Sequence, residues 1–202
     1  NKIDSMPLSK FIISLLNLPR LLLHIIFFYK HYDVCKEDVR VGMELRHWEC
    51  SPLKGFIYLL VFDKTFRNLF YYRIGGAKYL MWYWLNPHPC FTLATDMKAA
   101  PGFQCVHPFA SIINADCIGK DFSVKHSVTV GNKVGGSKNR PRIGDNVTIH
   151  CNAVVVGDIT IGNNVVIGSG TVLTKSVPDN CEVVGNPAII LRRDGVLVKE
   201  KL

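Results

Sequence analysis

The sequence contains no Cys-x-x-Cys pair, although seven of its 202 residues are cysteines. Pairs at that spacing are typical of structural zinc sites and of redox motifs, so their absence argues against both. The cysteines are odd in number and scattered, at positions 35, 50, 90, 105, 117, 151 and 181. This distribution favours reduced, buried thiols in a cytoplasmic protein.

No run of five basic residues occurs either, despite a formal net charge of +8, and no zinc-finger or RRM-like signature is present. The sequence therefore gives no indication of nucleic-acid binding. A basic surface that binds an anionic cofactor, or one that lies near an acidic membrane, accounts for the charge equally well.

A long uninterrupted apolar run is also missing. Residues 11–29 are strongly apolar, but Pro19 and Arg20 divide them and His24 follows. A membrane-spanning helix needs about 20 predominantly apolar residues, and a signal peptide would end in small residues rather than in Phe27-Phe28-Tyr29-Lys30. We therefore expect two short amphipathic helices that pack on the protein's own assembly or rest on the inner face of the membrane.

The second half of the chain has an aliphatic residue at every sixth position. The series consists of Val106, Ile112, Ile118, Val124, Val130, Ile143, Ile149, Val155, Ile161, Ile167 and Leu173. A period of six does not fit an α-helix and is too regular for a sandwich, but it fits short strands joined by turns, with three such faces in each coil. The spacing predicts a mainly β solenoid whose stacked coils bury a continuous aliphatic core.

The first 100 residues lack this repeat and carry no chemical motif. Three segments of this region are expected to be helices: Asp4–Asn17, Arg20–Tyr32 and Leu53–Gly75. The run Asn86-Pro87-His88-Pro89 then breaks the chain. The chain is thus expected to have three parts, a helical N-terminal region (1–100), a β-helix domain (101–191) and a C-terminal tail (192–202).

The repeat is interrupted between Val130 and Ile143, which lie thirteen residues apart, one more than two repeats. The segment 131–142 is rich in glycine and basic residues and has no core position. We expect it to leave the solenoid as an extruded loop. A long loop in an otherwise regular solenoid is more often functional than a tolerated insertion.

The repeat region contains the motifs His107-Pro-Phe-Ala-Ser-Ile-Ile-Asn114, Val124-Lys-His-Ser-Val-Thr-Val-Gly131 and Arg140-Pro-Arg-Ile143. Together with the repeat, they resemble the hexapeptide-repeat acyltransferases, and among these the serine acetyltransferase family, above all its shorter members found with polysaccharide-synthesis genes. The resemblance covers residues 102–193. It implies a left-handed parallel β-helix, a homotrimer, and transfer of an acetyl group from acetyl-CoA to an acceptor hydroxyl without a metal.

His107 occupies the place of the family's general base, in a segment of the form His-x-x-x-(Ile/Val)-(Ile/Val). An attacking hydroxyl must lose its proton, and imidazole titrates near neutral pH. A lone histidine on a surface strand usually has no catalytic role, so this assignment rests on the resemblance. His126 is the rival candidate. It stands where family members often carry Gln, which implies a hydrogen-bonding or oxyanion-stabilising catalytic residue rather than the base. His150 is expected to be a surface residue.

The resemblance also implies how the donor is bound. The family holds the pantetheine arm in a groove between neighbouring solenoids, along one column of backbone groups. The matching positions here are Asn132, Cys151, Ser169 and Gly170. The phosphates of the cofactor need cations, which Lys175, Arg192 and Arg193 could supply.

Two departures from the serine acetyltransferases leave the acceptor open. Those enzymes carry Asp just before the catalytic histidine, where this chain has Val106, and Arg-His before the loop proline, where it has Asn139-Arg140. Both changes remove groups that would bind serine, so the sugar of a surface polysaccharide is favoured over L-serine. The expected acceptor-binding residues are Phe109, Lys138 and Arg140.

Two other classes of protein stay open. A zinc enzyme similar to the gamma-class carbonic anhydrases uses the same solenoid with three histidine ligands, although positions 107, 126 and 150 do not match its spacing. A catalytically inactive scaffold is the other, since a fold does not define a function.

Overall fold

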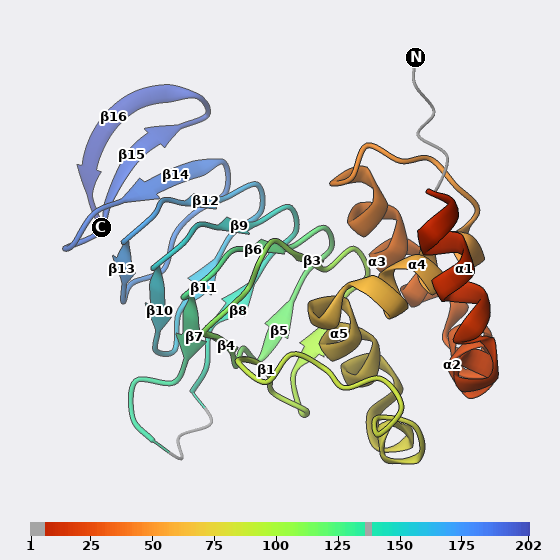
Figure 1. The fold of residues 1–202 in the computed structure, drawn as a ribbon. Helices are drawn as coiled ribbons and strands as arrows, with labels where there is room; N and C mark the ends of the chain where they lie inside the picture. The colour runs from red at the N-terminus through yellow and green to blue at the C-terminus, as the bar shows by residue number, and fades with distance from the viewer. Residues whose placement is uncertain (1–6, 136–138) are drawn as a thin grey trace. The chain divides into compact units, whose positions relative to one another are not determined.

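The structure, a computed structural model, describes residues 7–135 and 139–202, without the side chains of Phe11 and Leu18. The chain divides between His88 and Pro89 into a helical unit and a β unit (Figure 1). The expected fold class, helices followed by a parallel β-solenoid, is confirmed. The first solenoid strand begins at Phe91, before the boundary at residue 101 that the repeat suggested.

Within the described residues, the helical unit contains α1 (Leu8–Leu16), α2 (Leu18–Lys30), α3 (Tyr32–Glu44), α4 (Pro52–Phe62), α5 (Lys64–Ile74) and the 3-10 helix η1 (Gly75–Leu80). The expected helix over 53–75 is two helices. Asp63 ends α4 and caps α5, because its Oδ1 accepts hydrogen bonds from the backbone N–H groups of Thr65 and Phe66, at 2.8 and 3.1 Å. Asp4, the expected start of the first helix, lies outside the described residues.

Helix α3 is absent from the sequence prediction because its buried side includes a charged residue. Asp38 is 2% exposed, and its carboxylate accepts a hydrogen bond from Arg73 Nε of α5 at 2.8 Å. A buried carboxylate is stable only with such a partner. The partner is distant in sequence, so the local pattern around Asp38 reads as polar surface.

Aromatic rings fill the core of the helical unit. Phe28 of α2 stacks on Phe56 of α4 with ring centroids 4.3 Å apart, and Phe56 packs edge-on against Phe70 of α5 at 5.0 Å. His24 is fully buried, and its Nε2 lies 3.0 Å from the Tyr71 hydroxyl. Burial lowers the pKa of His24 to about 4, so the ring is neutral near pH 7.

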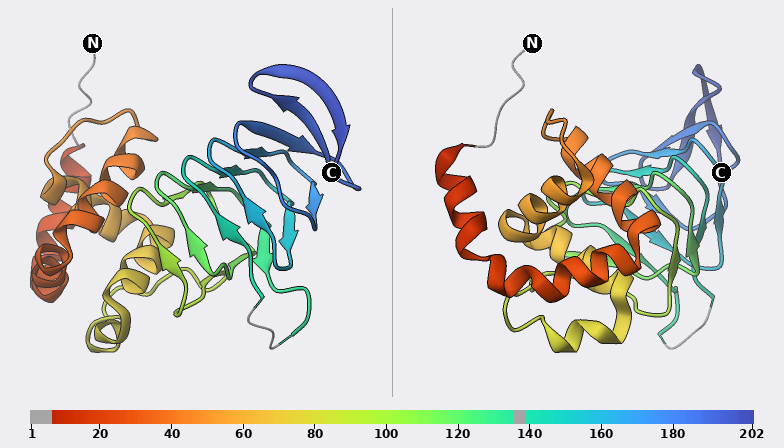
Figure 2. Two further views of the ribbon diagram at one scale, coloured as in Figure 1. Left: turned by 180° about the vertical axis from the view of Figure 1, so that it is seen from behind. Right: turned by 90° about the vertical axis from the view of Figure 1, so that its right-hand side faces the viewer.

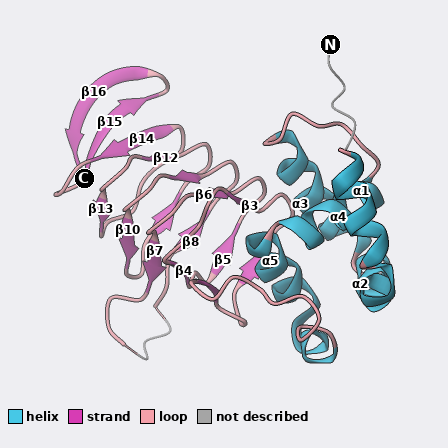
Figure 3. Ribbon diagram, in the orientation of Figure 1, coloured by secondary structure: helices cyan, strands magenta, loops and turns pink. Residues whose placement is uncertain are grey.

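The β unit winds through three sheets in turn, which we call A, B and C (Figure 3). In the described residues, sheet A contains β1 (Phe91–Leu93), β4 (Ser111–Ile113), β7 (Thr129–Gly131), β10 (Val154–Val156) and β13 (Val172–Leu173). Sheet B contains β2 (Lys98–Ala99), β5 (Cys117–Ile118), β8 (Arg142–Ile143) and β11 (Thr160–Ile161). Sheet C contains β3 (Gln104–Cys105), β6 (Ser123–Val124), β9 (Thr148–Ile149), β12 (Val166–Ile167), β14 (Cys181–Val184), β15 (Ile189–Arg193) and β16 (Val196–Lys201).

Each sheet sends one column of side chains into the core. The parallel register stacks Leu93, Ile113, Val130, Val155 and Leu173 in sheet A. It stacks Ala99, Ile118, Ile143 and Ile161 in sheet B, and Cys105, Val124, Ile149, Ile167 and Val183 in sheet C. The six-residue series is therefore correct from Ile118 onward. Its first two members, Val106 and Ile112, are not in these columns; Ile112 is 52% exposed.

Asparagine side chains stack at the corner between sheets B and C. Asn146, Asn164 and Asn180 each have a positive φ, of 55–57°. Their side-chain amides bond to one another along the stack, at 3.1 and 2.9 Å. Asparagine tolerates this backbone conformation better than most residues, which explains its recurrence at the corner.

The last strands depart from the parallel pattern. Strand β14 pairs in parallel with β12 but antiparallel with β15, and β15 pairs antiparallel with β16. The segment 192–202, expected as a tail, thus includes the end of β15 and all of β16.

No single helix in the described part of the chain is long and apolar enough to cross a membrane. One bent pair, Leu8–Leu16 with Pro19–Lys30, meets the length and composition requirement together, at an angle of 88°.

Gly144 lies where neighbouring coils approach closely, which gives a first prediction. A Cβ built there would lie 2.6 Å from Asn163 Oδ1 and 2.8 Å from the Gly162 carbonyl oxygen. Gly144→Ala should therefore cost about 1–3 kcal/mol of folding free energy, which lowers Tm by roughly 2–10 °C. Gly135→Ala is the matched control, because no heavy atom lies within 4 Å of its added Cβ. Equal Tm values for the two variants in a thermal melt would contradict this close approach.

Candidate functional site

The corner where the chain passes from sheet C to sheet A carries a column of aligned residues, Phe109, His126, Cys151 and Ser169. Backbone bonds fix the alignment: Ser127 N–H donates to the Phe109 carbonyl, Asn152 N–H to that of His126, and Gly170 N–H to that of Cys151, at 2.7–3.1 Å. The residue after each column member has a positive φ, at Ala110, Ser127, Asn152 and Gly170. We call this the C–A corner.

His107 and Pro108 form a two-residue insertion at the C–A corner. Cys105 pairs with Val124 and Ile113 with Val130, so eight residues on one coil face six on the next. The insertion is closed by a bond of 2.7 Å from Phe109 N–H to the His107 carbonyl. With it, eight positions separate the core residues Cys105 and Ile113, and only five separate Ile113 from Ile118. Val106 and Ile112 therefore continue the count of six back from Ile118 although neither is a core position. The structure therefore aligns His126 with Phe109, not with His107.

His107 is exposed and has a φ of 50°, outside the two columns of residues with positive φ at the regular corners. Such a conformation in a residue other than glycine costs on the order of 1–3 kcal/mol and is concentrated at functional sites. His126 is also exposed, on the adjacent coil. The two histidines predicted to be catalytic thus lie at the same corner, on neighbouring coils.

Ser111, which the sequence prediction missed, holds this corner in place. It is 1% exposed; its Oγ lies 3.1 Å from the Lys125 carbonyl oxygen and accepts a hydrogen bond of 3.1 Å from Val128 N–H. The hydroxyl thereby ties the turn after His107 to the turn that carries His126. Successive side chains of a strand point to opposite faces, so Ser111 and Ile113 point inward together. The sequence prediction missed Ser111 because it assigned Ile112, between them, to the core.

The outer face of sheet A extends from the C–A corner to the loop. Its side chains are cross-strand neighbours by register: Thr92, Ile112, Thr129, Val154 and Val172. At its far edge the chain leaves the solenoid after β7 and returns at β8, as an extruded segment (Figure 1). The expected loop 131–142 thus lies between these strands, with residues 136–138 outside the described residues. The candidate site consists of the outer face of sheet A, the C–A corner on one side of it and the loop on the other.

Arg140 fixes the returning end of the loop. Its Nη1 donates to Asp96 Oδ1 at 2.8 Å and to Asn114 Oδ1 at 2.9 Å, and its Nη2 lies 3.8 Å from Asp116. The Arg140 side chain is 13% exposed. The hydrogen bond from Arg140 lowers the pKa of Asp96. The guanidinium expected to bind an acceptor is therefore bonded to residues of the solenoid. No local pattern around Asp96 indicates it as the partner, because the two residues lie 44 positions apart.

Of the two remaining residues expected to bind the acceptor, the structure describes one. Phe109 is 56% exposed at the C–A corner, next to the insertion that carries His107. Lys138 lies outside the described residues.

The residues expected to bind the donor divide into three groups. Cys151 and Ser169 are neighbours at the C–A corner, with Sγ and Oγ 3.2 Å apart, and Gly170 follows Ser169. Asn132 lies at the start of the loop, where its Nδ2 donates to the Val134 carbonyl, and Lys175 lies in the turn after β13.

Arg192 and Arg193 form the third group, on β15. They are paired with Glu182 and Glu200 respectively. Both arginine side chains are more than 40% exposed, and exposed pairs of this kind contribute little to stability. The two arginines thus lie at the end of β15 and not at the C–A corner, and their side chains are accessible to solvent.

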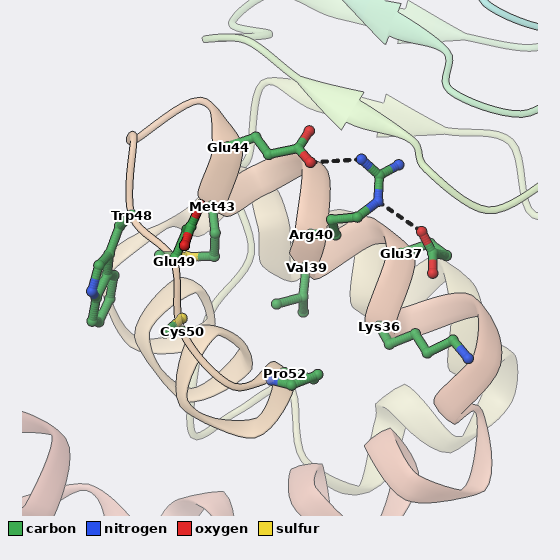
Figure 4. Close-up of a pocket in the computed structure, with 10 residues that line it drawn as sticks. All are labelled: Lys36, Glu37, Val39, Arg40, Met43, Glu44, Trp48, Glu49, Cys50 and Pro52. Atoms are coloured by element: carbon green, nitrogen blue, oxygen red, sulfur yellow. Dashed lines mark hydrogen bonds and ion pairs between the residues drawn. The ribbon is translucent and has the colours of Figure 1, made fainter. Parts of the chain in front are cut away.

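Two other features were given no role by the sequence. His150, which precedes Cys151 at the C–A corner, is half-buried, and burial together with the nearby Lys125 charge lowers its pKa. A pocket of about 410 Å³ opens in the helical unit beside α3, where Arg40 pairs with Glu37 and Glu44 (Figure 4). No residue predicted to be functional lines it. Among the described residues, no three His, Cys, Asp or Glu side chains are grouped as metal ligands.

A parallel β-solenoid with a six-residue repeat is the fold expected of hexapeptide-repeat proteins, and comparison with known families finds the same repeat. Residues 140–175 match the bacterial transferase hexapeptide family (six repeats). The Putative colanic acid biosynthesis acetyltransferase WcaB of Escherichia coli (strain K12) is 44% identical over 87 residues, 43% of this chain and 54% of the relative. The serine acetyltransferase of Staphylococcus aureus (strain N315) is 42% identical over 95 residues, 46% of this chain and 44% of the relative. The matches thus span about half the length of these relatives.

Solved structures extend the likeness to most of the chain. The serine acetyltransferase of Neisseria gonorrhoeae (CysE) superposes with a TM-score of 0.66 at 25% identity, covering 82% of this chain and 66% of that protein. The soybean serine acetyltransferase apoenzyme gives a TM-score of 0.67 at 22% identity, covering 85% and 73%. The resemblance to hexapeptide-repeat acetyltransferases expected from the motifs is confirmed.

Arg140 gives a prediction for the loop. Removing its bonds to Asp96 and Asn114 should cost about 1 kcal/mol for each lost hydrogen bond, so Arg140→Ala should speed trypsin cleavage after the exposed Lys133 by about fivefold or more. Arg142→Ala is the control, since Arg142 pairs with Asp158 at 2.9 Å on the exposed outside of the solenoid. Mass spectrometry of the Lys133–Val134 cleavage product measures the effect. Equal cleavage rates in the two variants would show that Arg140 does not hold the loop.

Proposed function

We propose that this protein is an acetyl-CoA-dependent O-acetyltransferase whose active site lies on the outer face of sheet A. The observation that carries the proposal is His107, an exposed histidine in a strained two-residue insertion of a hexapeptide-repeat solenoid. The acetyltransferase names of its relatives in sequence support the reaction type. The zinc-enzyme and scaffold hypotheses have no such observation in their favour.

In the proposed reaction, the acceptor hydroxyl oxygen attacks the carbonyl carbon of the acetyl thioester while His107 removes the hydroxyl proton. The carbonyl oxygen becomes an oxyanion, which a hydrogen bond from His126 on the adjacent coil would stabilise. The tetrahedral intermediate then collapses, the carbon–sulfur bond breaks, and His107 returns the proton to the CoA thiolate. The products are the acetyl ester and CoA.

The donor would lie along the C–A corner. Cys151, Ser169 and Gly170 present small side chains there, which leaves room for a pantetheine arm against the backbone. Exposed cations at Lys175, Arg192 and Arg193 would meet its phosphates by exchanging their present partners. We also propose a homotrimer, because three solenoids around an axis would give each such groove a second wall.

We propose a cytoplasmic location for the enzyme. All seven cysteines lie within the described residues and none of them is in a disulfide, which fits a reducing compartment.

For the acceptor we propose a sugar hydroxyl rather than L-serine. A serine zwitterion needs an anion for its ammonium group and a cation for its carboxylate. Val106 supplies no anion, and Arg140 is bonded to Asp96 and Asn114. The exposed ring of Phe109 beside His107 suits the apolar face of a sugar.

The general base gives the first test of this reaction. His107→Ala should lower kcat by about two to four orders of magnitude while CoA binding is nearly unchanged, because the base acts in the transition state. His126→Gln is the matched comparison and should be far milder, because an amide can still donate a hydrogen bond. CoA release and CoA binding measure the two effects. The reverse order of severity would assign the base to His126.

The acceptor gives the second test. Losing a charged contact typically costs a few kcal/mol, so kcat/KM for L-serine should be about 100-fold or more below that of the best sugar. CoA release is measured with L-serine and with capsular and lipid-linked sugars at matched concentration, and metal analysis of the same preparation tests the zinc hypothesis. A kcat/KM for serine within tenfold of that for the best sugar would contradict the proposed acceptor and would favour L-serine.

A further inference from the structure

Helix α1 has its polar side turned inward and its apolar side turned outward. Leu8 and Leu16 are 73% and 74% exposed, and Ile12 between them is 47% exposed. The inward side carries Ser14, which is 6% exposed, and Lys10, whose Nζ donates to the Tyr58 hydroxyl of α4 at 2.8 Å. A helix on the surface of a protein in water normally has the opposite arrangement.

Helix α2 continues the apolar surface. Leu22, Ile26 and Tyr29 recur at spacings of four and three, which puts them on one side of the helix, and they are 63%, 53% and 55% exposed. The opposite side packs into the core through Leu21 and Phe28, both fully buried. The exposed apolar residues of α2 are therefore not the ones that pack the helix against the core of its own unit. We call the exposed residues Leu8, Ile12, Leu16, Leu22, Ile26 and Tyr29 the outer apolar stripe.

The two helices that carry the outer apolar stripe have charged side chains of one sign. Residues 7–32 contain Lys10, Arg20 and Lys30 but no Asp or Glu. Arg20 and Lys30 are both exposed. The residues of the helical unit from 64 to 88 are likewise free of Asp and Glu. Such a surface is complementary to an anionic partner.

Further large apolar side chains, most of them aromatic, are exposed elsewhere in the same unit. In residues 79–84 the exposed large side chains are Tyr79, Leu80, Trp82, Tyr83 and Trp84. This segment is linked to α2 through Tyr71, whose hydroxyl lies 3.0 Å from His24 of α2 and donates to the Leu85 carbonyl at 2.8 Å. Tryptophan and tyrosine are enriched where proteins meet the headgroup region of a bilayer.

We propose that the outer apolar stripe docks on an acidic lipid bilayer, with α1 and α2 lying in the plane of its surface. The two helices meet at about a right angle (Figure 2), bent by 88°. Their 9 and 13 residues span about 14 and 20 Å, short of a hydrocarbon core of about 30 Å. Leucine and isoleucine enter the acyl boundary, and Arg20 and Lys30 bind anionic headgroups. The proposal does not depend on acetyl transfer.

Sedimentation with vesicles tests this docking on the full chain. The protein should bind vesicles of 70% POPC and 30% POPG at 0.1 M NaCl and should bind pure POPC vesicles at least about tenfold less. Leu22→Gln with Ile26→Gln should lower the partition coefficient on acidic vesicles by about tenfold or more, since two apolar side chains leave the acyl boundary. Arg20→Gln with Lys30→Gln should lower it by on the order of tenfold, and 0.5 M NaCl should abolish the difference between that variant and the wild type.

The matched control is Val196→Gln with Leu197→Gln, an apolar pair of β16 that is 65% and 55% exposed. It should bind vesicles as the wild type does. Circular dichroism and CoA release with a soluble acceptor should be unchanged in the Leu22/Ile26 variant, which separates lipid binding from folding and from the proposed reaction. Equal binding to POPC and POPG vesicles, or no binding to either, would overturn the proposal. So would a change in the mass of the lipid-free Leu22/Ile26 variant on ultracentrifugation, because a second copy would then be the occupant of the stripe.

Discussion

The backbone register between neighbouring coils is the constraint on which the rest of the β unit depends. Each coil bonds in parallel to the next, so a residue's place in the stack is set by the strand beneath it. The aliphatic columns can exclude water only while that register holds. The C–A corner, the outer face of sheet A and the loop are all placed by it, which makes the solenoid a rigid support for exposed polar groups.

Two departures from the register lie beside the candidate site. One is the two-residue insertion that carries His107, and the other is the loop between β7 and β8. Each is compensated by polar contacts from adjacent coils, through Ser111 in the first case and Arg140 in the second. A solenoid of this kind tolerates extra residues at its corners, where they can extend into solvent. Candidate functional groups can therefore lie at the corners while the core stays periodic.

The sequence predicted the solenoid because a six-residue period is a property of neighbours in the chain. The same reasoning failed where distant residues decide the outcome. Val106 and Ile112 kept the period by coincidence, since the insertion at His107 became visible only against the strand pairs Cys105–Val124 and Ile113–Val130. Helix α3 was missed because Arg73 neutralises Asp38 from another helix. The motifs made His107 a candidate for the general base, whereas its positive φ is visible only in the fold.

The antiparallel end of the stack has a consequence for the molecule in concentrated solution. A parallel coil presents unpaired backbone groups along its last turn, and another solenoid could add there in register to build a filament. Here β15 and β16 extend sheet C with two antiparallel strands, and the outer strand carries Lys199, Glu200 and Lys201. A second solenoid that approaches sheet C at this end meets a charged strand of the opposite direction, which disfavours end-to-end addition along that sheet.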